Sequence, residues 1–467
     1  MFTIDFKKPI HIHFIGIGGI SMSGLARLLL TRGFTISGSD RASSDLTVGL
    51  EKLGVKVYYS QTGENLTDDI DLVVYTAAVH PDNPEFAAAV EKGIPMMDRA
   101  ELLGQLSATY PVAIGVSGTH GKTTTTGMLA VILMEAMQDP TVALGGKMEA
   151  IGGNLRIGGD REFLFEACEY TNSFLKFNPT DEIILNIDAD HLDFFKDLDD
   201  IRNSFRLFAQ KLPADGHLVI NGEIPNLDQF LEGLHGTIDT YGLVPEGVLP
   251  ADSPYRYSAA NISFDARGCA SYDLYRNGAY VTRIELSVIG VHNVSNSLAA
   301  IAVAWLHDVP VETIRHALVS FRGTERRFEK KGVRNGVTIV DDYAHHPTEI
   351  RATLTAALAT PHKRLWVVFQ PHTFTRTLAL RKEFVDALSL ADNIVLAKIY
   401  AAREVDTGAI SSQDLVDDLR KMGREAYYFQ TFEEIEEFLK KNCVNGDLLI
   451  TMGAGNVVNI GNSLLKS

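Results

Sequence analysis

Short apolar runs alternate with segments of helical period along the chain, and glycine or polar turns separate them. Apolar runs bounded by turns are typical of strands buried on both faces of a parallel sheet. The segments between them have the period and length of crossover helices. The repeated order of strand, turn and helix therefore predicts an α/β protein.

The first stretch with this rhythm contains four expected strands and one clear helix. The strands are expected at residues 10–19, 35–40, 56–60 and 72–78, and the helix at residues 21–33, where Gly33 closes it. The polar stretch that follows ends this region near residue 107. These elements predict an N-terminal Rossmann-like domain.

Two further stretches follow, with an expected boundary near residue 323. The middle one has expected strands at 111–118, 163–168 and 182–188, helices at 123–137 and 296–308, and a β-rich portion between residues 217 and 290. The last one has expected strands at 337–344, 365–372, 393–400, 426–430 and 447–455. We therefore expect three domains: Rossmann-like at 1–107, a central P-loop ATPase-type parallel sheet with a β-rich portion at 108–322, and Rossmann-like again at 323–467.

Length and composition fit a multidomain globular enzyme. The chain has 467 residues, of which 45% are hydrophobic and 22% charged, so it is too apolar for a disordered chain. It carries 43 Lys and Arg against 59 Asp and Glu, a formal net charge of -16. Sequence-independent binding to nucleic acid needs dense positive charge, so we expect no nucleic-acid partner. The negative net charge does not exclude an anionic small substrate, because an acidic protein can hold a local cationic pocket.

The same sequence predicts the compartment. No apolar run reaches the roughly 18 residues that a spanning helix needs, and the start of the chain lacks the pattern of a signal peptide, so we expect no membrane insertion. Cys168, Cys269 and Cys443 are far apart and form no CxxC pair, which favours a reducing environment over a disulfide framework. We therefore expect a cytoplasmic protein.

The strongest local signal is the sequence Gly118-Thr119-His120-Gly121-Lys122-Thr123-Thr124, between an expected strand and an expected helix. A glycine turn lets backbone N–H groups surround a phosphate, and the helix N-terminus adds partial positive charge. Lys122 would reach the outer phosphates, and the Thr123 hydroxyl would bind Mg²⁺. Val116 stands where the strict P-loop pattern has its first glycine, but the strand before and the helix after still predict a phosphate site.

Two further strand ends carry candidate metal ligands. Glu166 lies near the end of strand 163–168, and Asp190 and His191 follow strand 182–188. Taken singly, Glu166 is explained by a solvated strand end and His191 by a loop hydrogen bond. Ligands collect outside the carboxyl ends of parallel strands, however, and these groups beside Thr123 suit a hard divalent cation. We therefore predict metal ligation.

A second glycine-rich turn runs from Gly16 to Gly24, again between a strand and a helix. It is similar to a dinucleotide fingerprint, except that Ser21 takes the place of the third glycine. Asp40 ends the second strand, where an acid would meet a ribose hydroxyl. The turn favours a diphosphate or nucleotide sugar without selecting NAD, and close packing of helix on strand is the alternative explanation.

Cationic and imidazole groups gather near two strand ends of the last stretch. Asp341 to His346 end one strand and Gln370 to Arg376 end the next, while Arg326 and Arg327 lie just before this region. Arg376 would clamp a carboxylate and Arg327 a phosphate by bidentate hydrogen bonds. The turn Gly453 to Asn456 either lets the backbone approach a ligand or only reverses the chain.

These motifs together resemble the Mur ligase family, and the resemblance covers essentially the whole chain. The motifs that carry it are HFIGIGGISMSGLA, SGSD, DNPE, RAELL, GTHGKTTTT, EACEYTNSFL, NIDADHLD, GVHNVSN, FRGTERRF, DDYAHHPTEI, QPHTFTRT and MGAGN. The family has a Rossmann-like domain for the UDP-sugar, a central ATPase domain and a C-terminal domain that closes over both. Its cofactors are ATP and Mg²⁺ (or Mn²⁺).

The resemblance implies a role for each matching residue. Gly118, Thr119, His120, Gly121, Lys122, Thr123 and Thr124 correspond to the ATP phosphate loop, Thr123, Glu166 and His191 to the metal positions, and Asn293, Arg327 and Asp342 to nucleotide contacts. Gly16, Gly18, Gly19, Ser21, Ser23 and Asp40 correspond to the UDP-sugar end, and His345, His372 and Arg376 to the side that receives the amine. Lys122, His191, His345 and Arg376 are the implied catalytic residues.

Three positions depart from the family pattern. Ser60-Gln61-Thr62 stand where a histidine is expected near the uracil. Thr373 replaces a second arginine of some relatives, which leaves Arg376 as the clearer carboxylate clamp. Phe205 stands where some sister ligases carry a carbamylated lysine, so we predict no lysine carbamate bridging a second metal.

The resemblance implies that the chain joins L-alanine to the lactyl carboxylate of UDP-N-acetylmuramate, through an acyl phosphate, in peptidoglycan precursor synthesis. A sister activity, the addition of a preformed peptide or another amino acid to the same UDP-sugar, is the alternative. A nicotinamide dehydrogenase built on the first domain leaves the segments GTHGKTT, DADHLD and DDYAHHP unexplained. A P-loop switch or scaffold that binds nucleotide without joining substrates is a further alternative, which ADP release coupled to amide formation would exclude.

Overall fold

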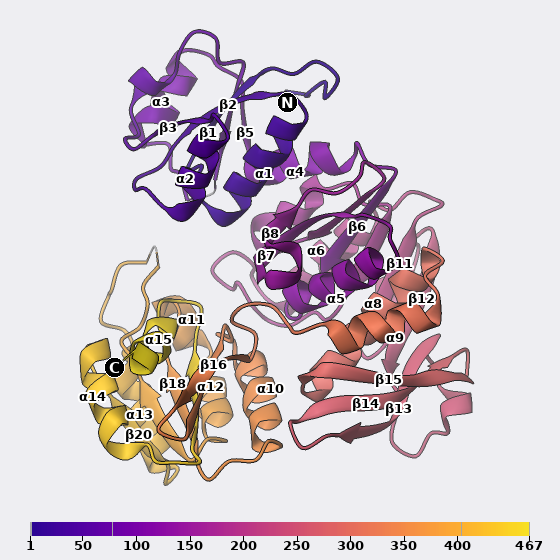
Figure 1. The fold of residues 1–467 in the computed structure, drawn as a ribbon, viewed down its shortest axis with the longest axis vertical. Coiled ribbons are helices and arrows are strands. Elements are labelled where there is room, and N and C mark those ends of the chain that lie inside the picture. Colours follow the sequence, from indigo (N-terminus) through magenta and orange to yellow (C-terminus); the bar gives the residue numbers. More distant parts are fainter. Residues whose placement is uncertain (1, 77, 403, 467) are drawn as a thin grey trace. The chain divides into compact units, whose positions relative to one another are not determined.

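The computed structural model describes residues 2–76, 78–402 and 404–466, so Ala77, in the expected strand 72–78, lies outside the described residues. The strands form three sheets, and each sheet takes its strands from one continuous stretch of the chain (Figure 1). By their contacts, the residues divide into two compact units. The first runs to Ile187 and includes Arg202–Asp239, and the second comprises Asp188–Ile201 and the chain from Thr240 onward.

The first sheet is parallel, with the strand order β3-β2-β1-β4-β5. Its strands are β1 (His11–Ile15), β2 (Thr35–Ser39), β3 (Lys56–Tyr58), β4 (Leu72–Tyr75) and β5 (Met96–Asp98). Its helices are α1 (Ile20–Thr31), α2 (Asp45–Lys52), α3 (Pro84–Glu91) and α4 (Arg99–Ser107), with a 3-10 helix η1 at Gly63–Asn65. The central strand β1 is shorter than the expected strand 10–19, because Gly16 turns the chain with φ +85°.

A second parallel sheet in the first unit has the strand order β11-β10-β6-β9-β7, and β8 adds to its edge antiparallel to β7. Its strands are β6 (Val112–Ser117), β7 (Thr141–Met148), β8 (Gly153–Arg156), β9 (Glu162–Glu166), β10 (Asp181–Ile184) and β11 (His217–Asn221). The helices of this region are α5 (Lys122–Glu135), α6 (Leu198–Ala209), α7 (Leu227–Leu231) and the 3-10 helices η2 (Glu149–Ile151) and η3 (Tyr170–Lys176). Residues Thr123 to Leu133 of α5 are all buried, which makes α5 a core helix rather than a surface one.

The predicted β-rich portion is present: its strands β12 to β15 belong to the second sheet, and all but the first three residues of β12 lie in the second unit. It consists of β12 (Thr237–Leu243), which pairs in parallel with β13 (Tyr257–Phe264), and of the antiparallel strands β14 (Cys269–Arg276) and β15 (Ala279–Ile289). The 3-10 helix η4 (Pro250–Asp252) precedes β13, and α8 (Val291–Leu306) and α9 (Val311–Ser320) follow β15. Helix α8 packs on these strands through a nearly continuous buried face from Asn293 to Ala304.

The third sheet has the strand order β16-β17-β21-β18-β19-β20 and is parallel except for its edge strand β16. Its strands are β16 (Glu329–Arg334), β17 (Val337–Asp342), β18 (Leu365–Phe369), β19 (Asn393–Leu396), β20 (Glu425–Tyr428) and β21 (Leu448–Met452). Its helices are α10 (Pro347–Leu358), α11 (Phe374–Ala379), α12 (Arg381–Leu388), α13 (Ser412–Lys421), α14 (Phe432–Asn442) and α15 (Val458–Lys466). Val367 and Val368 of β18 belong to separate core clusters, so hydrophobic layers cover both faces.

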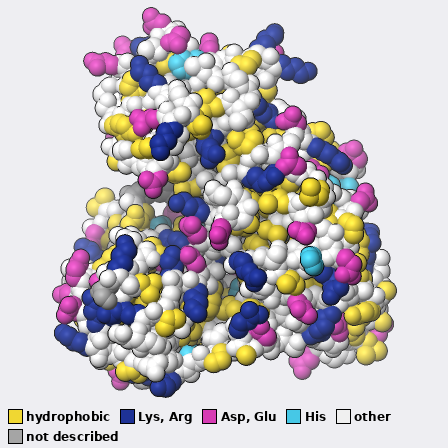
Figure 2. Space-filling model, in the orientation of Figure 1, with side chains coloured by type: hydrophobic (Ala, Val, Ile, Leu, Met, Phe, Trp, Pro, Cys, Tyr) yellow, Lys and Arg dark blue, Asp and Glu magenta, His cyan; other side chains and the backbone are white. Residues whose placement is uncertain are grey.

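Figure 2 shows acidic and basic side chains interspersed over the face that it draws. Within the described ranges, no helix combines the length and the apolar character needed to cross a membrane.

Candidate active site

The predicted phosphate loop lies between the end of β6 and the start of α5. Gly118 (φ +140°) and Gly121 (φ +87°) adopt conformations that side chains rarely adopt, and a Cβ at Gly118 would lie 2.8 Å from the Leu185 Cβ. The loop leads into the 14-residue helix α5, whose first backbone N–H groups have no partner within the helix. The loop therefore has the shape and the dipole that a phosphate group requires.

Asn186, just beyond β10, fixes the shape of this loop. Its Oδ1 accepts a hydrogen bond from the His120 N–H at 2.8 Å, and its Nδ2 donates to the His120 carbonyl at 3.0 Å. The Thr119 N–H donates to the Asn186 carbonyl at 3.2 Å. Asn186 is not among the site residues predicted from the sequence, although it begins the motif NIDADHLD.

Lys122 is held in place by the loop and by a carboxylate. Its Nζ donates to the carbonyls of Gly118 and Thr119 and lies 2.9 Å from the Glu169 Oε2. Burial opposes the charge on Lys122, but the nearby Glu169 carboxylate, together with Cys168 and Glu166, outweighs burial and raises the pKa of the ammonium group. Lys122 is therefore a fixed cation at the phosphate loop. Glu169, within the motif EACEYTNSFL, is a second residue that the sequence analysis missed.

Thr123 and Glu166 lie together, as predicted for metal ligands. The Thr123 Oγ1 donates to the Glu166 Oε2 at 3.0 Å, and the Glu166 Oε1 accepts from the Gly145 N–H at 2.6 Å. A Cβ at Gly145 would lie 2.9 Å from the same carboxylate, so Gly145 leaves room for it. A hydroxyl and a carboxylate are the hard oxygen donors that Mg²⁺ takes.

His191, the third predicted ligand, belongs to the second unit, and its part in the metal site stays a prediction. Among the residues that the structure describes, no group of three or more His, Cys, Asp and Glu side chains is arranged to hold a metal ion. Mg²⁺ at nucleotide sites usually takes one or two carboxylates, and phosphates and water supply its other ligands. The pair of Thr123 and Glu166 fits that kind of site.

The N-terminal glycine turn connects β1 to α1 and is closed by Asp40. The Asp40 Oδ2 accepts from the Gly18 N–H at 2.8 Å, and a Cβ at Gly18 would lie only 2.7 Å from this oxygen. Gly19 is the N-cap position of α1, so the turn presents a helix N-terminus. These features fit a diphosphate, as predicted from the sequence.

The two serines of this turn differ in their surroundings. Ser21 accepts a hydrogen bond from the Arg99 Nη1 at 3.1 Å and is partly exposed. Ser23 is buried, and its hydroxyl donates to the Ile20 carbonyl at 3.0 Å. Ser21 is therefore the better placed of the two to meet a ligand, and the role of Ser23 in substrate binding stays a prediction.

Gln61 lies in the segment Ser60-Gln61-Thr62, which departs from the family pattern, and it accepts a hydrogen bond from Asn83. The Asn83 Oδ1 accepts from the backbone N–H groups of Glu85 and Phe86, at 3.0 and 3.1 Å, and so caps α3. Its Nδ2 must then be the donor to the Gln61 Oε1, at 2.8 Å. Gln61 is thus oriented with its own amide N–H groups directed away from Asn83.

The second unit brings His345, His372 and Arg376 together, as the sequence predicts. The His345 and His372 ring centroids are 6.0 Å apart, and the Arg376 Nη1 lies 3.4 Å from the His372 Nδ1. The Arg376 Nη2 also lies 2.9 Å from the Asp190 Oδ1. The predicted carboxylate clamp thus already contacts a carboxylate of its own chain.

Glu349, at the start of α10, organises the neighbouring imidazole and guanidinium groups. Its Oε2 lies 3.2 Å from the His345 Nδ1 and accepts from the His345 N–H at 3.0 Å. Its Oε1 lies 3.7 Å from the Arg327 Nη1, and the Arg327 guanidinium stacks over the Tyr343 ring at 5.2 Å. Arg327 is therefore held at the end of β17, where it is predicted to meet the nucleotide.

Asp342 ends β17 and is buried. Its Oδ2 accepts from the Phe328 N–H at 2.7 Å, and its Oδ1 accepts from the Ala344 N–H at 2.8 Å. Burial raises the pKa of Asp342 to about 6, against the opposing effect of Arg327.

Asn293, the other predicted nucleotide contact, is buried at the start of α8. Its Nδ2 donates to the Ile289 carbonyl at 2.8 Å, and its Oδ1 accepts from the Asn296 Nδ2 at 3.0 Å.

Two hollows lie in the third sheet's region. One, of about 400 Å³, is at the carboxyl ends of β18 to β21, and Gln370, Tyr400 and Asn456 help to line it. The His372 ring stacks on Tyr400 with centroids 5.6 Å apart, which places the predicted amine side next to this hollow. The predicted turn Gly453 to Asn456 borders it.

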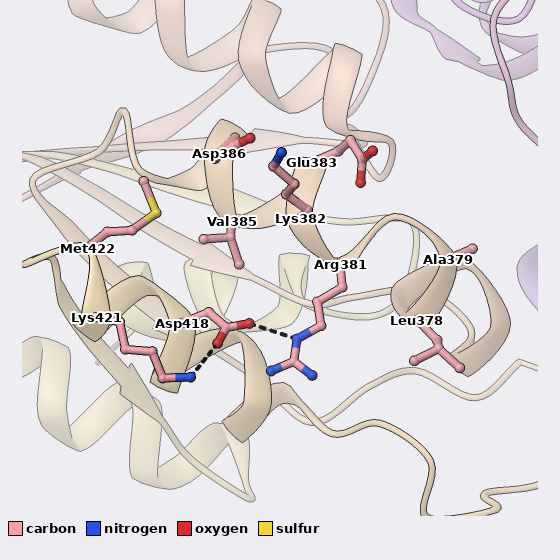
Figure 3. Close-up of a pocket in the computed structure, with 10 residues that line it drawn as sticks. All are labelled: Leu378, Ala379, Arg381, Lys382, Glu383, Val385, Asp386, Asp418, Lys421 and Met422. Carbon is pink, nitrogen blue, oxygen red and sulfur yellow. Dashed lines mark hydrogen bonds and ion pairs between the residues drawn. The ribbon is translucent and has the colours of Figure 1, made fainter.

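The other hollow, of about 560 Å³, lies among α11, α12 and α13 (Figure 3). Three of its charged groups form ion pairs: the Asp418 carboxylate lies 2.7 Å from the Arg381 Nε and 2.9 Å from the Lys421 Nζ. The residues that line it include none of those predicted for the site. This hollow therefore adds nothing to the active site.

Comparison with known proteins identifies the family to which the chain belongs. The domain descriptions "Mur ligase family, catalytic domain", "Mur ligase middle domain" and "Mur ligase, glutamate ligase domain" match residues 11–111, 116–304 and 326–455. The UDP-N-acetylmuramate–L-alanine ligase of Lachnospira eligens is 58% identical over 466 residues and covers 100% of both chains. That of Caldanaerobacter subterraneus is 49% identical and covers 99% of both.

Solved structures agree with the sequence relatives. The UDP-N-acetylmuramate–alanine ligase of Thermotoga maritima matches with a TM-score of 0.81 at 29% identity, over 98% of both chains. A murein peptide ligase of Psychrobacter arcticus matches with a TM-score of 0.72 at 26% identity, also over 98% of both chains. The chain therefore belongs to the Mur ligase family.

Proposed function

We propose that the protein joins L-alanine to the lactyl carboxylate of UDP-N-acetylmuramate, with ATP converted to ADP and phosphate. Eight relatives that carry the name UDP-N-acetylmuramate–L-alanine ligase are 47 to 58% identical to this chain and cover 98 to 100% of it. The observation that carries the proposal is Lys122, a fixed cation in a glycine loop at the start of α5, in a chain that matches such ligases over its full length.

A carboxylate does not react with an amine at neutral pH, because its charge repels nucleophiles and oxide would have to leave. Transfer of the γ-phosphoryl group of ATP to the carboxylate removes both obstacles, since the acyl phosphate has phosphate as its leaving group. Charge on the phosphoryl group during transfer is stabilised by Lys122 and by the backbone N–H groups of residues 121 to 124, at the start of α5. The amine of L-alanine then attacks the acyl carbon and displaces phosphate.

The residues that would hold Mg²⁺ are Thr123 and Glu166, with His191 as the further ligand predicted from the sequence. When bound, Mg²⁺ would supply positive charge that offsets the negative charge of the nucleotide phosphates. The Glu166 carboxylate orients the Thr123 hydroxyl at 3.0 Å in the present structure. Gly145, Asn186 and Glu169 keep the carboxylate, the loop and Lys122 in position.

The UDP-sugar is expected at the turn Gly16, Gly18 and Gly19, with Ser21, Ser23 and Asp40, and the nucleotide is expected to meet Asn293, Arg327 and Asp342. On the amine side, Arg376 would hold the α-carboxylate of alanine, and His345 and His372 would line the path of the amine. The cytoplasmic location stays a prediction from the cysteine pattern.

A sister activity, the addition of a preformed peptide to the same UDP-sugar, is the second candidate. The murein peptide ligase of Psychrobacter arcticus shares the fold, with a TM-score of 0.72. The sequence relatives favour alanine, because those at 47 to 58% identity carry the alanine ligase name.

Capture of the intermediate tests the reaction. The protein is incubated with ATP, Mg²⁺ and UDP-N-acetylmuramate without an amine, and borohydride is added to reduce any acyl phosphate to an alcohol. We expect the reduced sugar nucleotide to form only when ATP is present. Absence of this product, together with ATP turnover that needs no UDP-sugar, would contradict the proposal.

A further inference from the structure

Arg376 is bound to Asp190, a residue 186 positions earlier in the sequence. The Asp190 Oδ1 accepts from the Arg376 Nε at 3.1 Å and from its Nη2 at 2.9 Å. The Arg376 and Asp190 side chains are 11% and 7% exposed, so bulk water screens the pair little. Both residues belong to the second unit.

This contact uses one edge of the guanidinium group. An arginine side chain has five N–H donors in a planar fork. Asp190 takes one donor on Nε and one on Nη2, and the His372 Nδ1 lies 3.4 Å from Nη1. Donors on Nη1 and Nη2 therefore remain, and these two atoms form the edge that can bind a second carboxylate in bidentate fashion.

Asp190 is itself fixed on both sides. Its Oδ1 also accepts from the His191 N–H at 2.7 Å, and its own N–H donates to the Asp188 carbonyl at 3.0 Å. The His346 Nε2 lies within hydrogen-bond distance, 3.2 Å, of the Ala189 carbonyl and ties this segment to the start of α10. Asp190 thus offers Arg376 an anchored oxygen rather than a mobile one.

We propose that Asp190 is a positioning residue for the amine substrate: it holds the edge of Arg376 formed by Nε and Nη2, so that the adjoining edge formed by Nη1 and Nη2 receives the α-carboxylate of the amino acid. An arginine that is held in advance loses less conformational freedom when its ligand binds. The inference rests on the proposed function, because it needs an amino acid as substrate.

The test compares L-alanine with L-alaninamide, an amine that lacks the carboxylate, at saturating ATP and UDP-N-acetylmuramate. The measured quantity is the ratio of kcat/KM for alanine to kcat/KM for alaninamide in the full chain. In Asp190→Asn we expect this ratio to fall about tenfold, mainly through a higher KM for alanine. In an Arg376→Lys background, Asp190→Asn should change the ratio less than about twofold, because the two residues act through one contact.

Asp197→Asn is the matched control. Asp197 lies in the same segment, is exposed and accepts a hydrogen bond from the Asp200 N–H at 2.9 Å. The variant removes the same charge without touching Arg376, so the ratio should stay unchanged. Asp190→Glu, which keeps the charge but moves the oxygen, replaces Asp190→Asn if that variant does not fold, and its ratio should also fall.

Two results would overturn the inference. Equal losses for alanine and alaninamide in Asp190→Asn would mean that Asp190 does not act through the carboxylate site. A lower KM for alanine would mean that Asp190 competes with the substrate for Arg376. If the unaltered protein forms no amide with alanine at all, the proposed function fails instead, and the two failures are distinguishable.

Discussion

The Lys122 Nζ lies 2.9 Å from the Glu169 Oε2, so the phosphate loop holds its cation on a carboxylate of its own chain. The side chains are 15% and 3% exposed, and two loop carbonyls accept the other hydrogen bonds of the ammonium group. A phosphoryl group that enters the loop therefore meets an ammonium group already in position. We therefore expect phosphoryl transfer to depend on Lys122.

Lys122→Ala should abolish turnover and leave the UDP-sugar site intact. Loss of one buried, preorganised charge donor lowers kcat by about 10²- to 10³-fold or more. The glycine turn at Gly16 to Gly19 is a separate element, so the Kd for UDP-N-acetylmuramate should stay within about twofold. ADP release and titration calorimetry measure the two quantities. A variant that retains most of its turnover would contradict this role.

Gly145→Ala should weaken the metal site without altering any predicted ligand. The new Cβ would lie 2.9 Å from the Glu166 Oε2 and push the carboxylate away from Thr123. We expect the Mg²⁺ concentration for half-maximal activity to rise about tenfold, as for other changes around metal ligands. Gly49→Ala is the control, since among the described residues no neighbouring atom lies within 4 Å of its Cβ. An unchanged Mg²⁺ requirement would show that Glu166 does not serve the metal.

Gln61 should help to bind the UDP-sugar. Asn83 fixes its amide so that the Nε2 donors are directed away from Asn83, in the segment after β3. Gln61→Glu keeps an oxygen for Asn83 but removes these donors, and the KM for UDP-N-acetylmuramate should rise about two- to tenfold. The KM values for ATP and alanine should not change. A KM for the UDP-sugar equal to that of the unaltered protein would exclude the contact.

The pH dependence of kcat/KM for ATP should report Asp342. Its pKa is raised to about 6, so it loses its charge as the pH falls through 6. The protonated acid accepts the Phe328 and Ala344 N–H groups less well, and kcat/KM should therefore decrease below about pH 6. Asp342→Asn is neutral at every pH, so its kcat/KM should be low and should lack this step. If kcat/KM for ATP decreases by the same factor at low pH in Asp342→Asn, the pH dependence belongs to another group.

The alternation of apolar runs and turns predicted most of the architecture. The expected strand and helix positions correspond to β1, β6, β9, β10, β17, β18 and α5, because buried parallel strands carry a strong local signal. Strands β8 (GNLR) and β16 (EKKGVR) were not expected. Both lie at sheet edges, where charged and small residues replace the apolar run. The domain boundaries near 107 and 323 stay predictions.

The sequence located individual site groups but not their partners. Thr123 and Glu166 were predicted together because parallel strands present their carboxyl ends at one edge. Asn186 and Asp190 each bond to a residue far along the chain, 66 and 186 positions away. Such pairs depend on the three-dimensional path of the loops, which no local pattern records. Gly145 was missed for the same reason, because its role is to leave space for a side chain 21 residues away.

The most direct test of the account is the coupling of ADP release to amide formation. The protein is assayed with ATP, Mg²⁺ and UDP-N-acetylmuramate, and with L-alanine, glycine, L-serine or a tripeptide as the amine. We predict that ADP and UDP-N-acetylmuramoyl-L-alanine form in equal amounts and only when all three substrates are present, with alanine the best amine. ADP release that does not need the sugar nucleotide, or a clear preference for the tripeptide, would contradict the account.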